Sequence, residues 1–109
     1  MKDRREINIE VFEDTMKNYK SNPTLKAAVS NSVANQKFTA ADETVELPQC
    51  AGYTPTVTVS GKRSLEAAVE YAKQGMKTCV LNFASASNPG GGVTHGSSAQ
   101  EESICRCST

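Results

Sequence analysis

Two glutamates that follow a run of three glycines are the residues of this chain whose types and spacing favour chemistry. Residues Asn88–Gly92 (NPGGG) are followed, after the seven-residue spacer Val93–Ala99, by Gln100–Glu102 (QEE). Glycines permit positive φ and carry no Cβ atoms, so the backbone of this run can approach a ligand closely. A carboxyl group beside such a ligand can act as a general acid or base. The pattern predicts a site for a phosphate- or ribose-bearing substrate.

Each half of this pattern also has an ordinary structural explanation. A segment rich in glycine and serine is often only a connection between elements. Acidic residues in a first helical turn favour the helix dipole, and Ser98 with Glu101 fits a capping box. Both explanations are compatible with a site, because neighbouring helical residues point about 100° apart. Glu101 can then close the cap or bind a hydroxyl group while Glu102 faces the loop.

The remaining residues with reactive side chains form no recognisable site. His95 is the only histidine and has no acidic partner at ligand spacing, so we expect it at the surface. The spacing of this histidine and the neighbouring cysteines matches no standard zinc pattern; the residues are Cys79, His95, Cys105 and Cys107. We therefore expect no metal and no other cofactor.

Four helices are expected to carry or support the glycine loop. A stripe of apolar residues three and four positions apart predicts the first helix over about Arg5–Lys20: Ile9, Phe12, Met16 and Tyr19. A break at Ser21–Pro23 precedes a second helix with Thr24 as N-cap. A third helix is predicted from a cap at Ser64 to a C-terminal glycine, Gly75. The fourth is predicted to begin at a cap on Ser98, to run through Ile104 and to include Thr109.

Two strands are expected around the third helix. Thr56–Ser60 (TVTVS) is β-branched, and Lys77–Phe83 (KTCVLNF) is an apolar run bounded by turn signals. The order strand, helix, strand predicts a parallel βαβ unit with a right-handed crossover. The loop over residues 84–97 would then lie beyond the carboxyl end of a strand, where open α/β sheets bind ligands. We therefore expect an α/β fold.

Length and composition indicate one domain over residues 1–109. The 12 Lys and Arg residues equal the 12 Asp and Glu residues, so no basic excess indicates DNA binding through phosphates. The charged N-terminus is not a secretory signal, and no apolar run is long enough to span a bilayer. We expect a cytoplasmic protein that does not bind membranes, with its four cysteines as reduced thiols.

Three segments in order closely resemble the microbial-type poly(ADP-ribose) glycohydrolase family: Val80–Ser85, Asn88–Gly92 and Gln100–Arg106. The signature of that family is a triple glycine, a short spacer and Gln-Glu-Glu. The ordered match spans 27 residues and continues more weakly over nearly the whole chain. The resemblance implies a macrodomain, a three-layer α/β/α sandwich that binds ADP-ribose. It also implies hydrolysis of the ribose–ribose bonds of poly(ADP-ribose), without a metal.

The resemblance further implies roles for individual residues. Glu102 would be the catalytic acid, with Glu101 beside it at the catalytic centre and in contact with the substrate ribose. A positioned acid of this kind contributes roughly 10²- to 10⁴-fold to the rate. A helix N-terminus lowers the pKa of such a carboxyl group, whereas a bound diphosphate raises it. The implied substrate-binding residues are Asn88, Gly90, Gly91, Gly92 and Gln100.

Family members continue beyond the position of Thr109. We therefore expect this chain to be the N-terminal portion of the catalytic domain, incomplete for activity by itself. A sheet cut at this point would leave an exposed edge that favours self-association. Two alternatives stay open: a non-catalytic module that binds ADP-ribose, and an inactive truncated fragment stabilised by self-association that binds no ligand.

Overall fold

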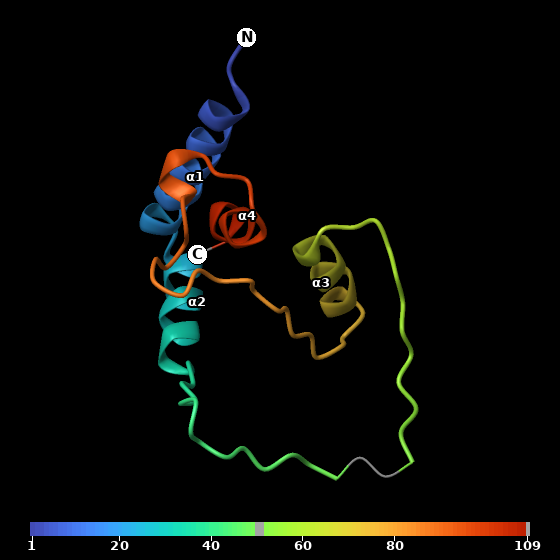
Figure 1. Ribbon diagram of the computed structural model, residues 1–109. Coiled ribbons are helices and arrows are strands. Elements are labelled where there is room, and N and C mark those ends of the chain that lie inside the picture. The colour runs from blue at the N-terminus through green and yellow to red at the C-terminus, as the bar shows by residue number, and fades with distance from the viewer. Residues whose placement is uncertain (50–51, 109) are drawn as a thin grey trace.

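The structure is a computed structural model, and it describes residues 1–49 and 52–108. Its elements are α1 (Arg4–Ser21), α2 (Pro23–Ala34), α3 (Ser64–Lys73), the 3₁₀ helix η1 (Val93–His95) and α4 (Gln100–Cys107). Helix α1 contacts α2, η1 and α4, and η1 also contacts α4. Figure 1 shows these four elements together, with α3 set apart at the end of a long connecting segment.

The first two helices form where the sequence predicts them. The apolar stripe of α1 is half-buried at all four predicted positions, Ile9, Phe12, Met16 and Tyr19. The break at Ser21–Pro23 is confirmed, but the predicted cap at Thr24 is wrong. Asn22 is the N-cap of α2, and its Oδ1 accepts hydrogen bonds from the N–H groups of Thr24 (2.9 Å) and Leu25 (3.3 Å). Pro23 then occupies the first helical turn, where its missing N–H has no cost.

Helix α3 is close to its prediction, whereas the start of α4 differs. Helix α3 begins at Ser64, but the predicted cap at Ser64 is wrong, because Arg63 is the N-cap. Gly75 follows the end of the helix with φ of 80°, as a C-terminal glycine should. The predicted cap of α4 at Ser98 is wrong, because Ala99 is the N-cap and has no side chain to accept a hydrogen bond. Helix α4 ends at Cys107 with Ser108 as its C-cap. The prediction for Thr109 lies outside the described residues.

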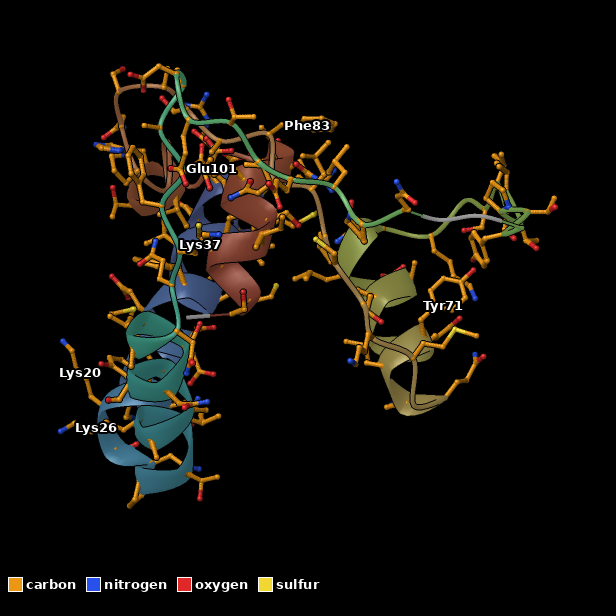
Figure 2. All side chains as sticks on the ribbon, turned by 90° about the horizontal axis from the view of Figure 1, so that it is seen from below. Lys20, Lys26, Lys37, Tyr71, Phe83 and Glu101 are labelled. Carbon is orange, nitrogen blue, oxygen red and sulfur yellow. The ribbon has the colours of Figure 1, made fainter. Side chains whose placement is uncertain are left out.

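The predicted α/β sandwich is wrong. The part of the chain that the structure describes contains no strand, and neither Thr56–Ser60 nor Lys77–Phe83 has regular structure. A β-branched segment becomes a strand only when a neighbour lies about 4.8 Å away along the hydrogen-bonding direction. These two segments do not run side by side in either view (Figures 1 and 2). The parallel βαβ unit and the sheet edge expected to drive self-association are therefore absent from the described residues.

Buried side chains gather around the loop and α4. Val93 is the one buried apolar side chain among the described residues, at 7% exposure. The others that are buried carry charge: Glu101, Glu102 and Arg106. The best-packed region of the described chain is thus the contact between the glycine loop, α4 and α1.

None of the helices within residues 1–49 and 52–108 is long and apolar enough to cross a membrane.

Candidate active site

The three glycines turn the chain sharply in front of α4. Gly90 and Gly91 have φ of 80° and 56°, the left-handed region in which a Cβ atom is unfavourable. The N–H of Gly91 donates to the carbonyl oxygen of Asn88 at 2.9 Å, which closes a tight turn. The predicted need for positive φ in this run is confirmed at these two positions.

Glu101 fastens the loop to the helix through both of its carboxylate oxygens. Oε1 accepts a hydrogen bond from the N–H of Gly90 at 2.9 Å, and Oε2 accepts one from the N–H of Ser85 at 2.7 Å. The side chain is 6% exposed, so solvent competes little for these bonds. Hydrogen bonds to a charged acceptor contribute about 1.5–3 kcal/mol each. Figure 2 shows Glu101 where the loop meets α4.

Glu102 is held through only one oxygen. Its Oε1 accepts a hydrogen bond from the N–H of Gly92 at 2.9 Å. Its Oε2 receives no hydrogen bond from another residue in the described part of the chain, and this oxygen is not fully enclosed. The two neighbouring carboxylates therefore differ. Both oxygens of Glu101 accept backbone hydrogen bonds, whereas only Oε1 of Glu102 accepts one from another described residue.

The environment lowers the pKa of Glu102 below the ordinary value of 4.5. The largest cause is the hydrogen bond from the N–H of Gly92, followed by its own N–H group; the Arg106 charge adds to both, and burial opposes them. A lowered pKa in the folded state means that the ionised form stabilises the fold above pH 4.5. That stabilisation is lost as the pH falls through the folded-state pKa.

The missing Cβ atoms make room for these carboxylates. A Cβ atom at Gly91 would lie 2.9 Å from Cδ of Glu102 and 3.2 Å from Oε2 of Glu101. One at Gly92 would lie 3.1 Å from Cβ of Ser97 and closer still to its Oγ. Sequence reasoning expected the glycines to admit a ligand. In the structure they first admit the chain's own carboxylates.

The glycine amide hydrogens are already bonded within the protein. Gly90 and Gly92 donate to Glu101 and Glu102, and Gly91 donates to Asn88. The negative charge bound by this concave stretch of backbone is therefore that of the protein's own carboxylates, Glu101 and Glu102. Contacts of Gly90, Gly91 and Gly92 with a substrate stay predictions, and they would use groups other than these amide hydrogens.

Asn88 lies exposed at the start of the turn. Its Nδ2 donates to the carbonyl oxygen of Gly91 at 2.8 Å, and its own N–H donates to Oγ of Ser85 at 3.2 Å. Its Oδ1 accepts no hydrogen bond from the described residues, which leaves one acceptor facing outward from the loop.

The side chain of Gln100 binds the backbone of the segment before the loop, much as a neighbouring strand would. Its Oε1 accepts from the N–H of Phe83 at 2.7 Å, and its Nε2 donates to the carbonyl oxygen of Leu81 at 2.8 Å. The same Nε2 lies 3.2 Å from Oγ of Ser64, the first residue of α3. Its amide therefore joins three segments of the chain, and its predicted contact with substrate stays a prediction.

Arg106 and Asn8 belong to this region, and sequence reasoning missed both. Arg106 is 7% exposed, and its Nη1 donates to the carbonyl oxygen of Ser97 at 2.9 Å. Asn8 on α1 donates from Nδ2 to the carbonyl oxygen of Gly96 at 2.9 Å. The four-residue spacing from Glu102 to Arg106 was a usable signal, since such pairs share a helix face. Nothing local in the sequence indicates the contact of Asn8, which joins residues 88 positions apart.

Other reactive side chains lie around the site without joining it. His95 is exposed in η1, as expected, with Nδ1 3.1 Å from Oγ1 of Thr94. Cys79, Cys105 and Cys107 are free thiols, and Cys50 lies outside the described residues. Burial, with the nearby glutamates, raises the pKa of Cys105. Within the described residues, no group of three or more His, Cys, Asp or Glu side chains is arranged to hold a metal ion.

A cavity of about 600 Å³ lies between α4, α1 and the start of α3. Its charged lining residues are Arg4, Arg63, Glu66 and Arg106. Neither Glu101 nor Glu102 lines it. The catalytic pair expected from the sequence therefore faces the glycine loop and not this cavity.

Comparison with known proteins identifies a family for this chain. Residues 8–109 match the family described as microbial-type PARG, catalytic domain, where PARG denotes poly(ADP-ribose) glycohydrolase. No curated protein and no solved structure gives a significant match. The matched range contains Asn8, the glycine run, both glutamates and Arg106. The family implies activity of the poly(ADP-ribose) glycohydrolase type on poly(ADP-ribose) as substrate. This chain therefore belongs to the microbial-type PARG catalytic domain family.

Proposed function

We propose that this chain carries the acid/base centre of a poly(ADP-ribose) glycohydrolase, with Glu102 as the residue that transfers the proton. One observation carries this proposal. Glu101 has both carboxylate oxygens bound to backbone N–H groups, whereas Oε2 of Glu102 accepts no hydrogen bond from another of the described residues. A general acid must reach the reacting oxygen of the substrate with a free oxygen of its own.

The chemistry of the bond explains why such a group is needed. Cleavage of a glycosidic bond passes through an oxocarbenium-like transition state and releases a poor alkoxide leaving group. Protonated Glu102 would give its proton to that oxygen, and the resulting carboxylate would then accept a proton from the attacking water. Glu101, bound to Gly90 and Ser85, would keep the loop in place during both steps.

The lowered pKa of Glu102 opposes the first step, because the group is ionised in the free protein. A bound substrate would raise this pKa. Its diphosphate carries negative charge, and a like charge nearby raises the pKa of a carboxyl group. We therefore expect the pKa of Glu102 to be higher when ADP-ribose is bound than when it is absent.

Substrate contacts would come from the outward side of the loop. Oδ1 of Asn88 is the free acceptor there, suited to a hydroxyl group of a ribose. Gly90, Gly91 and Gly92 have their amide hydrogens bound within the protein, so they would contact the sugar by close packing of backbone that carries no side chains.

The first prediction is that Glu102→Gln lowers release of ADP-ribose from poly(ADP-ribose) by about 10²- to 10⁴-fold. Glutamine keeps an oxygen for the N–H of Gly92 but holds no transferable carboxyl proton, so ADP-ribose binding and stability should be retained. Glu13→Gln, on the exposed face of α1, is the matched control and should leave release unchanged. Release is measured by chromatography of the products and binding by calorimetry.

Three outcomes would contradict parts of this proposal. Full release by the Glu102→Gln variant would remove Glu102 from the chemistry. Binding of ADP-ribose without release by the unsubstituted chain would favour a non-catalytic binding module, for which the ionised carboxylate is well suited. A carboxyl-resolved NMR titration in which ADP-ribose binds but the pKa of Glu102 does not rise would exclude the role of the diphosphate.

A further inference from the structure

A closed ring of hydrogen bonds joins one turn of α4 to the loop. Glu102 and Arg106 lie one turn apart on the same face of that helix. At one end of the ring, the N–H of Gly92 donates to Oε1 of Glu102 at 2.9 Å. At the other end, Nη1 of Arg106 donates to the carbonyl oxygen of Ser97 at 2.9 Å. The loop closes the ring itself, because the N–H of Ser97 donates to the carbonyl oxygen of Gly92 at 3.2 Å.

This ring leaves no room for a side chain at its inner corner. A Cβ atom at Gly92 would lie 3.1 Å from Cβ of Ser97 and closer still to its Oγ. The two loop residues are therefore in direct contact as well as hydrogen-bonded. A displacement of Ser97 would move Gly92, and with it the N–H group that holds Glu102.

Arg106 is buried without a carboxylate partner. Its side chain is 7% exposed, and the ion pairs within the described residues, Lys2–Glu10 and Lys62–Glu70, do not include it. An uncompensated buried charge is costly unless neighbouring groups stabilise it. The groups available here are the carbonyl oxygen of Ser97 and the negative charge of Glu102, whose pKa this arginine lowers.

Helix α1 fixes the same turn from outside. Oγ1 of Thr15 donates to the carbonyl oxygen of Arg106 at 2.7 Å, and Nδ2 of Asn8 donates to the carbonyl oxygen of Gly96 at 2.9 Å. A Cβ atom at Gly96 would lie 2.9 Å from Cα of Arg5, so the two backbones are in contact. The end of α4 and the end of the loop are thus both attached to α1.

We propose that Arg106 is a positioning residue for Glu102. It holds Ser97 against α4, and through Ser97 it keeps the N–H of Gly92 on Oε1 so that Oε2 stays free toward the loop. The catalytic consequence rests on the function proposed above, but the positioning itself does not. The positioning is a property of the substrate-free protein, and it is measured in that state.

Other charged and titratable groups around the carboxylate are few. On α4 they are Glu101, which is bound to the loop backbone, and Cys105, whose pKa is raised by burial and by the two glutamates. On η1, His95 is exposed, and on α1 the contacts with the loop come from the backbone of Arg5 and the uncharged side chain of Asn8. Arg106 is the one charged side chain that lowers the pKa of Glu102.

The second prediction is that Arg106→Gln raises the pKa of Glu102 and speeds hydrogen exchange at the Gly92 amide by about tenfold, the loss of one hydrogen-bonded restraint. Both quantities are measured by NMR on the full chain without substrate. Arg63→Gln removes the same charge from the start of α3 and should change neither. Arg106→Lys keeps the charge but donates from a single nitrogen, so it should restore the pKa and leave exchange at Gly92 intermediate.

The outcomes separate this proposal from the enzymatic one. The positioning proposal is overturned if a folded Arg106→Gln variant keeps the Glu102 pKa and the exchange rate of the Gly92 amide unchanged. It is also overturned if Arg63→Gln changes both quantities as much as Arg106→Gln does. If Arg106→Gln does not fold by circular dichroism, Arg106→Lys decides, and unchanged exchange at Gly92 in that variant overturns the proposal. Because neither readout uses substrate, absence of glycohydrolase activity would leave the result intact. Where activity is present, Arg106→Gln should lower kcat more than it changes KM.

Discussion

At the scale of single residues, the site separates two adjacent carboxylates by the bonds that each accepts. Glu101 is bound at both oxygens, by Ser85 and Gly90, whereas Glu102 is bound at one. The N–H groups of Ser85 and Gly90 are already bonded to Glu101, so they are not available to Oε2 of Glu102.

The third prediction concerns Gly91, which lies against both carboxyl groups. In Gly91→Ala the new Cβ atom would come within 2.9 Å of Cδ of Glu102, on a backbone with φ of 56°. We expect a loss of about 1–3 kcal/mol in the free energy of unfolding, because a non-glycine residue in this conformation is strained. Gly61→Ala is the control, since nothing lies within 4 Å of a Cβ atom there and its φ is ordinary. Urea unfolding of both variants measures the difference, and equal midpoints would contradict the prediction.

At the scale of elements, side-chain hydrogen bonds attach α1 both to α4 directly and to the loop before α4. Asn8 and Thr15 reach from α1 to the carbonyl oxygens of Gly96 and Arg106. Gln100 performs a similar task for the segment before the loop, by binding Leu81 and Phe83. Polar side chains therefore do here what paired strands were expected to do.

The fourth prediction tests this attachment through α1. Asn8→Ala removes a partly buried hydrogen bond to Gly96 and leaves that carbonyl oxygen without its partner, so it should cost about 1 kcal/mol in the free energy of unfolding. Asn18→Ala, in the same helix, removes only local bonds to Asp14 on an exposed face and should cost much less. Chemical unfolding followed by circular dichroism makes the comparison. A cost at Asn18 as large as that at Asn8 would show that the contact with the loop contributes nothing.

At the scale of the whole molecule, the described chain is open. Its Cα radius of gyration is 16.9 Å, with extents of 55 × 32 × 30 Å. A compact domain of this size has a radius of about 13 Å. Many large apolar side chains are exposed, among them Val57, Val59, Leu81 and Phe83. Figure 1 shows the reason, since residues 35–49 and 52–63 extend away from the helices without packing against them.

The fifth prediction follows from this openness. Small-angle X-ray scattering, extrapolated to zero concentration, should give a radius of gyration no smaller than 16.9 Å. The extrapolation is the control, because it removes any contribution from association. A radius of about 13–14 Å, the value for a compact domain, would show that the segments outside the helices pack together in solution.

The sequence by itself determined most of the helices and the family. Helical periodicity and glycine or proline signals are local, so α1, α2 and α3 fall close to their predicted ranges. The order of glycine run, spacer and Gln-Glu-Glu is likewise local, and it identified the family that residues 8–109 match. The cap of α4 was misplaced by one residue, because Ser98 is of a residue type that favours caps but Ala99 takes the N-cap position.

Only the tertiary structure decided how the site is built. Strand propensity in Thr56–Ser60 and Lys77–Phe83 describes each segment alone, but a sheet depends on which segments become neighbours, and these two do not. The contacts of Asn8 with Gly96 and of Arg106 with Ser97 depend on chain folding in the same way. So does the difference between Glu101 and Glu102, because adjacent identical side chains can be distinguished only by the groups that the fold brings to each of them.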